Sequence, residues 1–244
     1  QTQWAVHNFP IPGLRMPREF LRALGLIKAA AAETNAALGL LAPELARAIS
    51  MAAGDVAAGS HDAQFPVDVF QTGSGTSSNM NANEVIATLA ARAGGRPVHP
   101  NDHVNLGQSS NDVIPAAIQV SAVLATRERL LPALRHLRRT IERRAAKLGG
   151  VVKTGRTHLM DAMPLTLAQE LSAWAAQLRS AEERIVQTLE RLQRLPLGGT
   201  AIGTGINADR RFARRAAAVL SRHSGVKFVA ADNLFEGIAA QDHA

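Results

Sequence analysis

Apolar positions in the second half of the chain recur at intervals of three, four and seven residues, which is the spacing of one helix face. The spacing predicts a long helix over about 112–147 and another over about 164–194, separated by a turn at 147–158. Long helices with a narrow apolar stripe usually pack in bundles. The stripe of the second helix, interpreted as core, consists of Leu167, Leu171, Trp174, Leu178, Ala181, Ile185, Leu189 and Leu192.

Shorter helical segments, joined by polar loops, account for the rest of the chain, and no pair of strands is expected. The change of pattern after about residue 108 predicts an all-α protein with two domains. These are an N-terminal helical domain over 1–108 and part of a long-helix bundle over 109–244. The shorter predicted helices cover 17–35, 42–59, 81–94 and 208–225, with a last one beginning near Leu234.

Composition narrows the class of protein. The 244 residues are 46% hydrophobic and only 4% aromatic, with no Tyr, which favours helices over β-sandwiches. The absence of Cys excludes disulfides and thiolate chemistry. No apolar run is long enough for a membrane span and no signal peptide is evident, so a cytoplasmic protein without a membrane partner is expected. The net charge of +7 is attributed to a solvated arginine face at 126–147, and nucleic-acid binding is not expected because no aromatics interleave with it.

Clusters of small polar residues stand just before predicted helices in three places, at 71–85, 100–117 and 153–167. Unpaired N–H groups and the positive end of the dipole make a helix N-terminus a site for anions. In the first cluster, Gly73 and Gly75 permit close backbone approach and the hydroxyls of Ser74 and Thr76 are donors. An ordinary N-cap with a flexible loop explains this cluster equally well. A phosphate loop, a dinucleotide fingerprint and a hydrolase serine are excluded by the motif itself.

The second cluster contains more capping residues than one helix needs, since Ser109, Ser110, Asn111 and Asp112 follow one another. Just before it, "HPNDH" at 99–103 has histidines and an aspartate that would bind a metal if they shared a helix. The proline and asparagine indicate a loop instead, and no metal site is expected there.

The third cluster has a histidine, His158, beside Arg156 and Thr157. A histidine side chain can act as acid or base at neutral pH, although a lone histidine is often structural. If all three clusters met around one small dicarboxylate, fixed donors would stabilise the charge that develops when a proton leaves the carbon next to a carboxylate.

The long polar motifs together resemble class II fumarase, of the fumarase/aspartase superfamily. The similar segments are "NFPI" (8–11), "RMPREFLRALGLIKAAAAETN" (15–35), "QTGSGTSSNMNANEVIA" (71–87), "HPNDHVNLGQSSNDVIPAAIQV" (99–120), "KTGRTHLMDAMPLTLAQELSAW" (153–174) and "LGGTAIGTGIN" (197–207). The resemblance implies reversible hydration of fumarate to L-malate by acid/base chemistry, without metal or cofactor. It also implies a homotetramer in which each active site draws on loops of three chains.

Residue by residue, the resemblance implies that His158 donates and accepts the proton. It implies substrate binding by Ser74, Gly75, Thr76, Ser109, Ser110, Asn111 and Thr157. A second dicarboxylate site is implied at His99, Pro100, Asn101 and Asp102.

Two alternatives stay open at this point. An aspartase-like ammonia lyase would use the same scaffold, but aspartases typically have Gln where His158 follows "GRT". A non-catalytic helical interaction fragment is the other, because the family's mobile Gly-Ser-Ser loop with its catalytic serine does not occur in this sequence. We therefore expect a truncated chain that is inactive alone.

Overall fold

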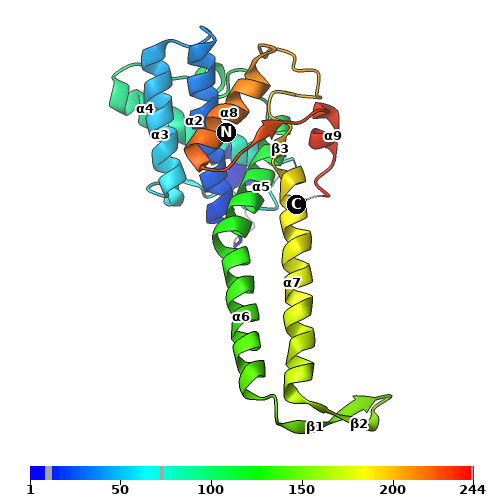
Figure 1. Cartoon of the computed structure of the whole chain (residues 1–244). Helices are drawn as coiled ribbons and strands as arrows, with labels where there is room; N and C mark the ends of the chain where they lie inside the picture. The colour runs from blue at the N-terminus through cyan, green and yellow to red at the C-terminus, as the bar shows by residue number, and fades with distance from the viewer. Residues whose placement is uncertain (9–12, 72–73, 243) are drawn as a thin grey trace. The chain divides into compact units, whose positions relative to one another are not determined.

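The computed structural model describes residues 1–8, 13–71, 74–242 and 244, and most of them lie in α-helices joined by short loops (Figure 1). The predicted all-α class is confirmed. The helices are α1 (Thr2–Asn8), α2 (Arg18–Ala37), α3 (Pro43–Ala58), α4 (Thr76–Gly94), α5 (Ser110–Ala125), α6 (Leu131–Lys147), α7 (Leu167–Leu192), α8 (Phe212–Ser224) and α9 (Leu234–Ala239). Single turns of 3₁₀- or π-helix occupy Asp62–Gln64, Pro100–Val104 and Thr126–Leu130. Among the described residues, no helix combines the length and apolar character needed to cross a bilayer.

The helix predictions agree with these bounds to within a few residues, with two differences. The predicted helix at 112–147 is divided by the π-helical turn Thr126–Leu130 into α5 and α6. Helix α4 begins at Thr76, five residues before its predicted start, because the polar residues that were assigned to a loop form its first turn. Residues 9–12, part of the "NFPI" similarity, and Gly73 lie outside the described residues.

The chain divides into two compact units, residues 1–124 with 192–244 and residues 125–191. The predicted domains 1–108 and 109–244 divide the chain elsewhere, and that division stays a prediction.

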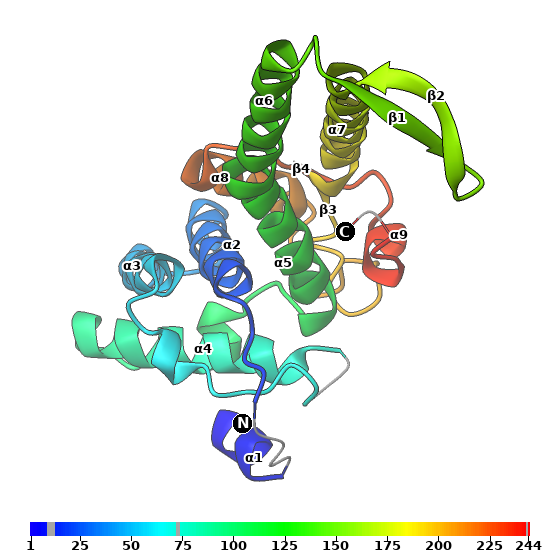
Figure 2. The same ribbon diagram turned by 90° about the horizontal axis from the view of Figure 1, so that it is seen from below.

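In the first unit, α2 is the central helix and lies against α3 and α8, while α3 also contacts α4 (Figure 2). Small residues allow this close packing. A Cβ atom on Gly25 of α2 would lie 2.7 Å from the carbonyl oxygen of Ala53 in α3, so only glycine permits this approach. Nearly all of α2 is buried, including the run Ala29–Ala32 and one charged side chain, Lys28.

In the second unit, α6 and α7 are linked across by ion pairs, among them Arg179 with Glu142 at 3.1 Å. Arg135 and Arg138 of α6 also contact Glu182 of α7, so part of the predicted arginine face is paired rather than only solvated. The apolar stripe of α7 is not a closed core within this chain, because Trp174 is 50% exposed.

The expectation that the chain has no strand pair is wrong. Strands β1 (Val152–Thr157) and β2 (Met160–Thr166) form an antiparallel hairpin where a turn was predicted. The hairpin is hard to predict because neither of its faces is buried, so no alternation of apolar and polar residues marks the strands. A second, minimal pair, β3 (Arg194–Leu195) and β4 (Val229–Ala230), is parallel and belongs to the first unit.

Candidate active site

The first polar cluster forms the beginning of α4. Gly75 is the residue before the helix and has a left-handed backbone, with φ of 68°. A Cβ atom at this position would lie 2.9 Å from Cγ1 of Ile114, so both the backbone angle and the space favour glycine. The hydroxyls of Ser74 and Thr76 lie 3.1 Å apart, on the solvent side of this turn. The cluster is therefore a rigid, donor-bearing helix start.

The second cluster forms the beginning of α5 and meets the first. The Ser110 hydroxyl lies 3.1 Å from that of Thr76, so two helix N-termini converge on one place. The Ser109 hydroxyl accepts a hydrogen bond from the Asn111 N–H at 3.2 Å. The Asn111 side-chain amide donates to the carbonyl of Ala201 at 2.8 Å, which brings a third segment to the same place.

Asp112, considered from the sequence only as a cap, has a larger role in the structure. Its side chain is fully buried and accepts three backbone hydrogen bonds. One oxygen accepts from the N–H of Ser109 at 2.9 Å, and the other accepts from Gly198 at 2.8 Å and Thr200 at 2.9 Å. The carboxylate thereby ties the start of α5 to the glycine-rich loop 197–205.

Lys28 is a buried cation beneath the second cluster that sequence reasoning missed. Its ammonium group donates to Oδ1 of Asn105 at 2.8 Å and to Oε1 of Gln108 at 3.0 Å. The Asn79 amide donates to the same Asn105 oxygen at 3.3 Å. The available signal was a single lysine in the otherwise apolar stretch "LGLIKAAAA", where a solvated charge has no place.

Burial changes the acid–base properties of this interior. It lowers the pKa of Lys28 to about 7, and the negative charge of Asp112 opposes that shift. It raises the pKa of Asp112 to about 6, against the three backbone N–H groups and the positive charge of Lys28. Each charge thus partly offsets the desolvation of the other.

The predicted second dicarboxylate site lies on a single π-helical turn, Pro100–Val104, rather than in an irregular loop. The His99 side chain accepts from the N–H of Asp102 at 3.1 Å, and the His103 side chain accepts from the N–H of His99 at 2.9 Å. Asn101 and Asp102 are exposed. Nowhere among the described residues do three or more His, Cys, Asp or Glu side chains gather in a way that could hold a metal ion. The second-site assignment stays a prediction.

The third cluster belongs to the other compact unit and is described by itself. Thr157 pairs with Met160, so His158 and Leu159 form the two-residue turn of the hairpin. Both have positive φ, 49° and 63°, which is the conformation of a type I′ turn and is uncommon for residues other than Gly and Asn. Thr157 and His158 are exposed.

A family model described as "Lyase" matches residues 1–244. The chain belongs to the Lyase family. It is 68% identical over 242 residues to the class II fumarate hydratase of Xylella fastidiosa (strain Temecula1 / ATCC 700964), a match that covers 99% of this chain and 51% of the relative. It is 55% identical to class II fumarate hydratase 2 of Pseudomonas aeruginosa, covering 100% of this chain and 53% of the relative.

Solved structures give the same result. The class II fumarase of Schistosoma mansoni matches with a TM-score of 0.95 and 37% identity, over 99% of this chain and 55% of that chain. A fumarate lyase:delta crystallin of Brucella melitensis bound to cobalt matches with a TM-score of 0.92 and 42% identity, over 97% of this chain and 53% of that chain. The resemblance to class II fumarases inferred from the motifs is confirmed. The chain spans about half the length of the relatives it matches.

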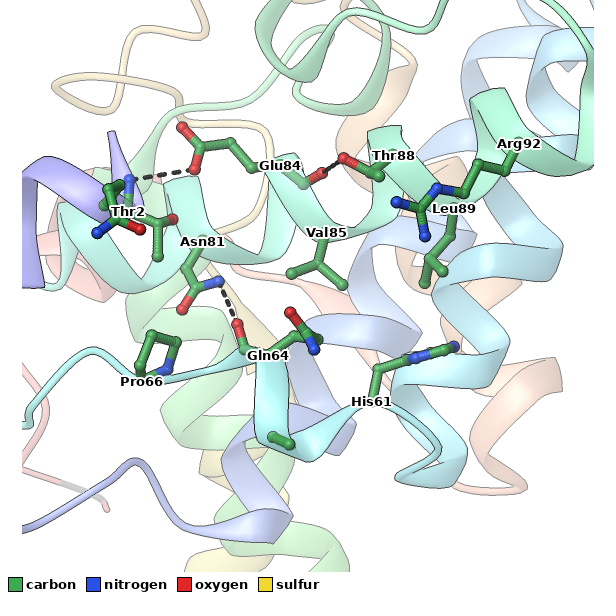
Figure 3. Close-up of a pocket in the computed structure, with 12 residues that line it drawn as sticks. Thr2, His61, Gln64, Pro66, Asn81, Glu84, Val85, Thr88, Leu89 and Arg92 are labelled. Carbon is green, nitrogen blue, oxygen red and sulfur yellow. Dashed lines mark hydrogen bonds between the residues drawn. The ribbon is translucent and has the colours of Figure 1, made fainter.

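A surface pocket of about 510 Å³ lies elsewhere on the first unit, between the start of α1, the Asp62–Gln64 turn and α4 (Figure 3). Asn81 donates to the carbonyl of Gln64 there at 2.9 Å, and Glu84 accepts from the N–H of Thr2 at 3.1 Å. None of the predicted site residues lines it. This pocket therefore does not coincide with the candidate site.

Proposed function

We propose that this lyase chain is part of a class II fumarate hydratase, which reversibly hydrates fumarate to L-malate. The observation that carries the proposal is the contact between Thr76 and Ser110 at the first residues of α4 and α5. Two converging helix starts supply N–H groups, hydroxyls and positive dipole ends to one anion. The high identity to proteins named class II fumarate hydratase supports the same substrate.

The chemistry needs fixed donors and one group that moves a proton. In the dehydration direction, a base takes a proton from the carbon next to a carboxylate of L-malate. The neighbouring hydroxyl then accepts a proton and leaves as water, and the electron pair left on the carbon forms the double bond of fumarate. The carbanion-like charge spreads onto that carboxylate, where neutral donors such as Thr76, Ser110 and Asn111 stabilise it. His158 handles a proton directly or through water, and Thr157 binds a carboxylate. The proposal requires no cofactor and no metal.

We further propose that the active sites form between copies of the chain in a homotetramer. The hairpin of the second unit supports this, because Leu159 is 101% exposed and Met163 is 80% exposed. On α6 and α7, Leu137 and Trp174 are 48% and 50% exposed. Apolar side chains gathered on one unit are unfavourable in water and mark an interaction surface. A cytoplasmic location is part of the same proposal.

The test is the reaction of the full-length protein with fumarate, followed by its absorbance, first in water alone and then with ammonia. We expect loss of absorbance without ammonia and L-malate as the product. Loss that requires ammonia would instead support the aspartase-like alternative. Absence of both reactions would favour the non-catalytic interaction fragment. The rate of fumarate hydration by a His158→Asn variant then shows whether the measured reaction uses the candidate active site.

A further inference from the structure

We propose that Asp112 is a positioning residue of the candidate active site, and that the loop 197–205 which it holds forms one wall of that site. The inference rests on the proposed function and adds a residue and a segment to it. Asp112 itself is buried and has no access to substrate, so its effect acts through the groups to which it is bonded.

The carboxylate joins two segments that are far apart in the sequence. Its three bonds run to Ser109, which is in the second cluster, and to Gly198 and Thr200 in the loop. No water competes for these bonds, because the side chain is fully buried. Charge-assisted bonds to a carboxylate are roughly twice as strong as bonds between neutral groups. A single side chain thus fixes the relative position of both segments.

The loop needs such a restraint because its backbone is strained. Thr200 has a φ of 54°, in the left-handed region, although it is not glycine. On the other side, Gly198 approaches α8 so closely that a Cβ atom would lie 2.7 Å from Cβ of Ala213. The hydroxyl of Thr200 is buried and has no hydrogen-bond partner, so it does not hold the loop itself. The carboxylate on one side and α8 on the other hold this conformation.

The position of the loop decides how Asn111 presents its amide. The next carbonyl along the loop, that of Ala201, accepts the hydrogen bond from Nδ2 of Asn111 at 2.8 Å. Because a carbonyl only accepts, this bond commits one of the two Nδ2–H donors of Asn111 to the loop and leaves the other for a ligand. The chain of contacts therefore runs from Asp112 through Thr200 and Ala201 to a predicted substrate-binding side chain.

The experiment is a double-mutant cycle between Asp112→Asn and Asn111→Ala in the full-length protein, measured as kcat/KM for fumarate hydration. We expect Asp112→Asn to lower kcat/KM about tenfold or more, because the amide must turn its NH2 group toward at least one of the three N–H groups that the carboxylate accepts. If Asp112 acts through Asn111, the double variant loses no more than the worse single variant. Asp232→Asn, an exposed carboxylate of the same unit that contacts Arg194, is the matched control and should keep its activity.

Additive losses in the cycle, or an Asp112→Asn variant as active as the wild type, would overturn the proposal. If Asp112→Asn does not fold, the Thr200→Gly variant tests in its place whether the position of the loop affects activity. Glycine accepts a φ of 54° without strain, so this variant should fold normally while the loop loosens and kcat/KM falls severalfold. A folded Thr200→Gly variant with unchanged kcat/KM would equally overturn it.

Failure of the proposed function can be distinguished from failure of the positioning role, because only the former leaves the wild-type protein without fumarate hydration. If the wild type does not hydrate fumarate, the same cycle is measured on fumarate binding by titration calorimetry. Weaker binding by Asp112→Asn, not additive with Asn111→Ala, would then support the positioning role alone. A wild-type protein that neither hydrates nor binds fumarate would overturn both proposals.

Discussion

The hydroxyl oxygen of Thr76 lies 3.1 Å from that of Ser110, although the two residues are separated by the whole of α4 and the turn that follows it. Each is the first residue of its helix, so the contact brings two sets of unpaired N–H groups together. A helix cap alone does not need a second helix N-terminus beside it. The arrangement is suited to an anion with more than one carboxylate.

The close contact behind this arrangement is tested by Gly75→Ala, with Gly95→Ala as its control. Both glycines flank α4 and have similar left-handed backbones, with φ of 68° and 62°. A Cβ atom at Gly75 meets Ile114 at 2.9 Å, whereas one at Gly95 meets nothing within 4 Å. Overpacking typically costs about 1–3 kcal/mol, so Gly75→Ala should lower the free energy of unfolding by that much more than the control. Equal losses in urea denaturation would show that the Ile114 contact is not restrictive.

The buried lysine predicts a pH dependence of stability in the alkaline range. The pKa of Lys28 is about 7 in the fold against an ordinary 10.5, so the unfolded chain binds more protons between these values. Stability from this group is therefore present at high pH and is lost as the pH falls through 7. Lys28→Met should remove this rise in the free energy of unfolding between pH 7 and 10, on the order of a few kcal/mol. The exposed Lys227→Met should keep it; an identical pH profile in both variants would contradict the burial of Lys28.

The buried carboxylate of Asp112 predicts that the free energy of unfolding changes with pH in the opposite direction in the acid range. The pKa of Asp112 is about 6 in the fold against an ordinary 3.8, so the folded chain holds the proton longer. Its contribution is present below pH 4 and is lost as the pH rises through 6. The free energy of unfolding of the wild type relative to Asp112→Asn should accordingly fall between pH 4 and 6. A relative stability that rises over this interval would mean that the carboxylate is ionised in the fold at acid pH.

His158→Asn should abolish most of the turnover of the full-length protein and leave the fold intact. Acid–base groups contribute about 10²–10⁴-fold to rate, and asparagine is favoured at the positive φ of a type I′ turn. The control is His136→Asn, an exposed histidine on α6 in the same unit. Circular dichroism should match the wild type in both variants. Turnover within about threefold of wild type would remove His158 from the mechanism, since general acid–base groups contribute far more.

Much of the fold could be predicted because helix faces repeat regularly in the sequence. The predicted helices 17–35, 42–59 and 208–225 agree with α2, α3 and α8 to within four residues at each end, and the polar residues before α5 marked its start. The hairpin Val152–Thr166 could not be predicted in this way, because it buries neither face and its turn contains His158 and Leu159 rather than Asn and Gly.

The hydrogen-bond donors of the candidate site could be predicted from the sequence, but the buried residues that hold them in place could not. Ser110 and Asn111 stand in a conspicuous polar run. The bonds of Asp112 reach Gly198 and Thr200, far along the chain, and no local pattern encodes such a distant contact. Lys28 shows only as one charge in an apolar helix, and its partners Asn105 and Gln108 are recognisable only in the fold.

The central claim is that the converging helix starts of the first unit and His158 of the second unit serve one dicarboxylate site formed between chains. The most direct measurement is the fumarate hydration rate of mixed oligomers, obtained by co-expressing full-length Ser110→Ala and His158→Asn subunits. Each variant alone should be nearly inactive. The mixture should regain a measurable part of the wild-type rate, because some sites then receive Ser110 from one chain and His158 from another. A mixture no more active than the average of the two variants would contradict a site shared between chains.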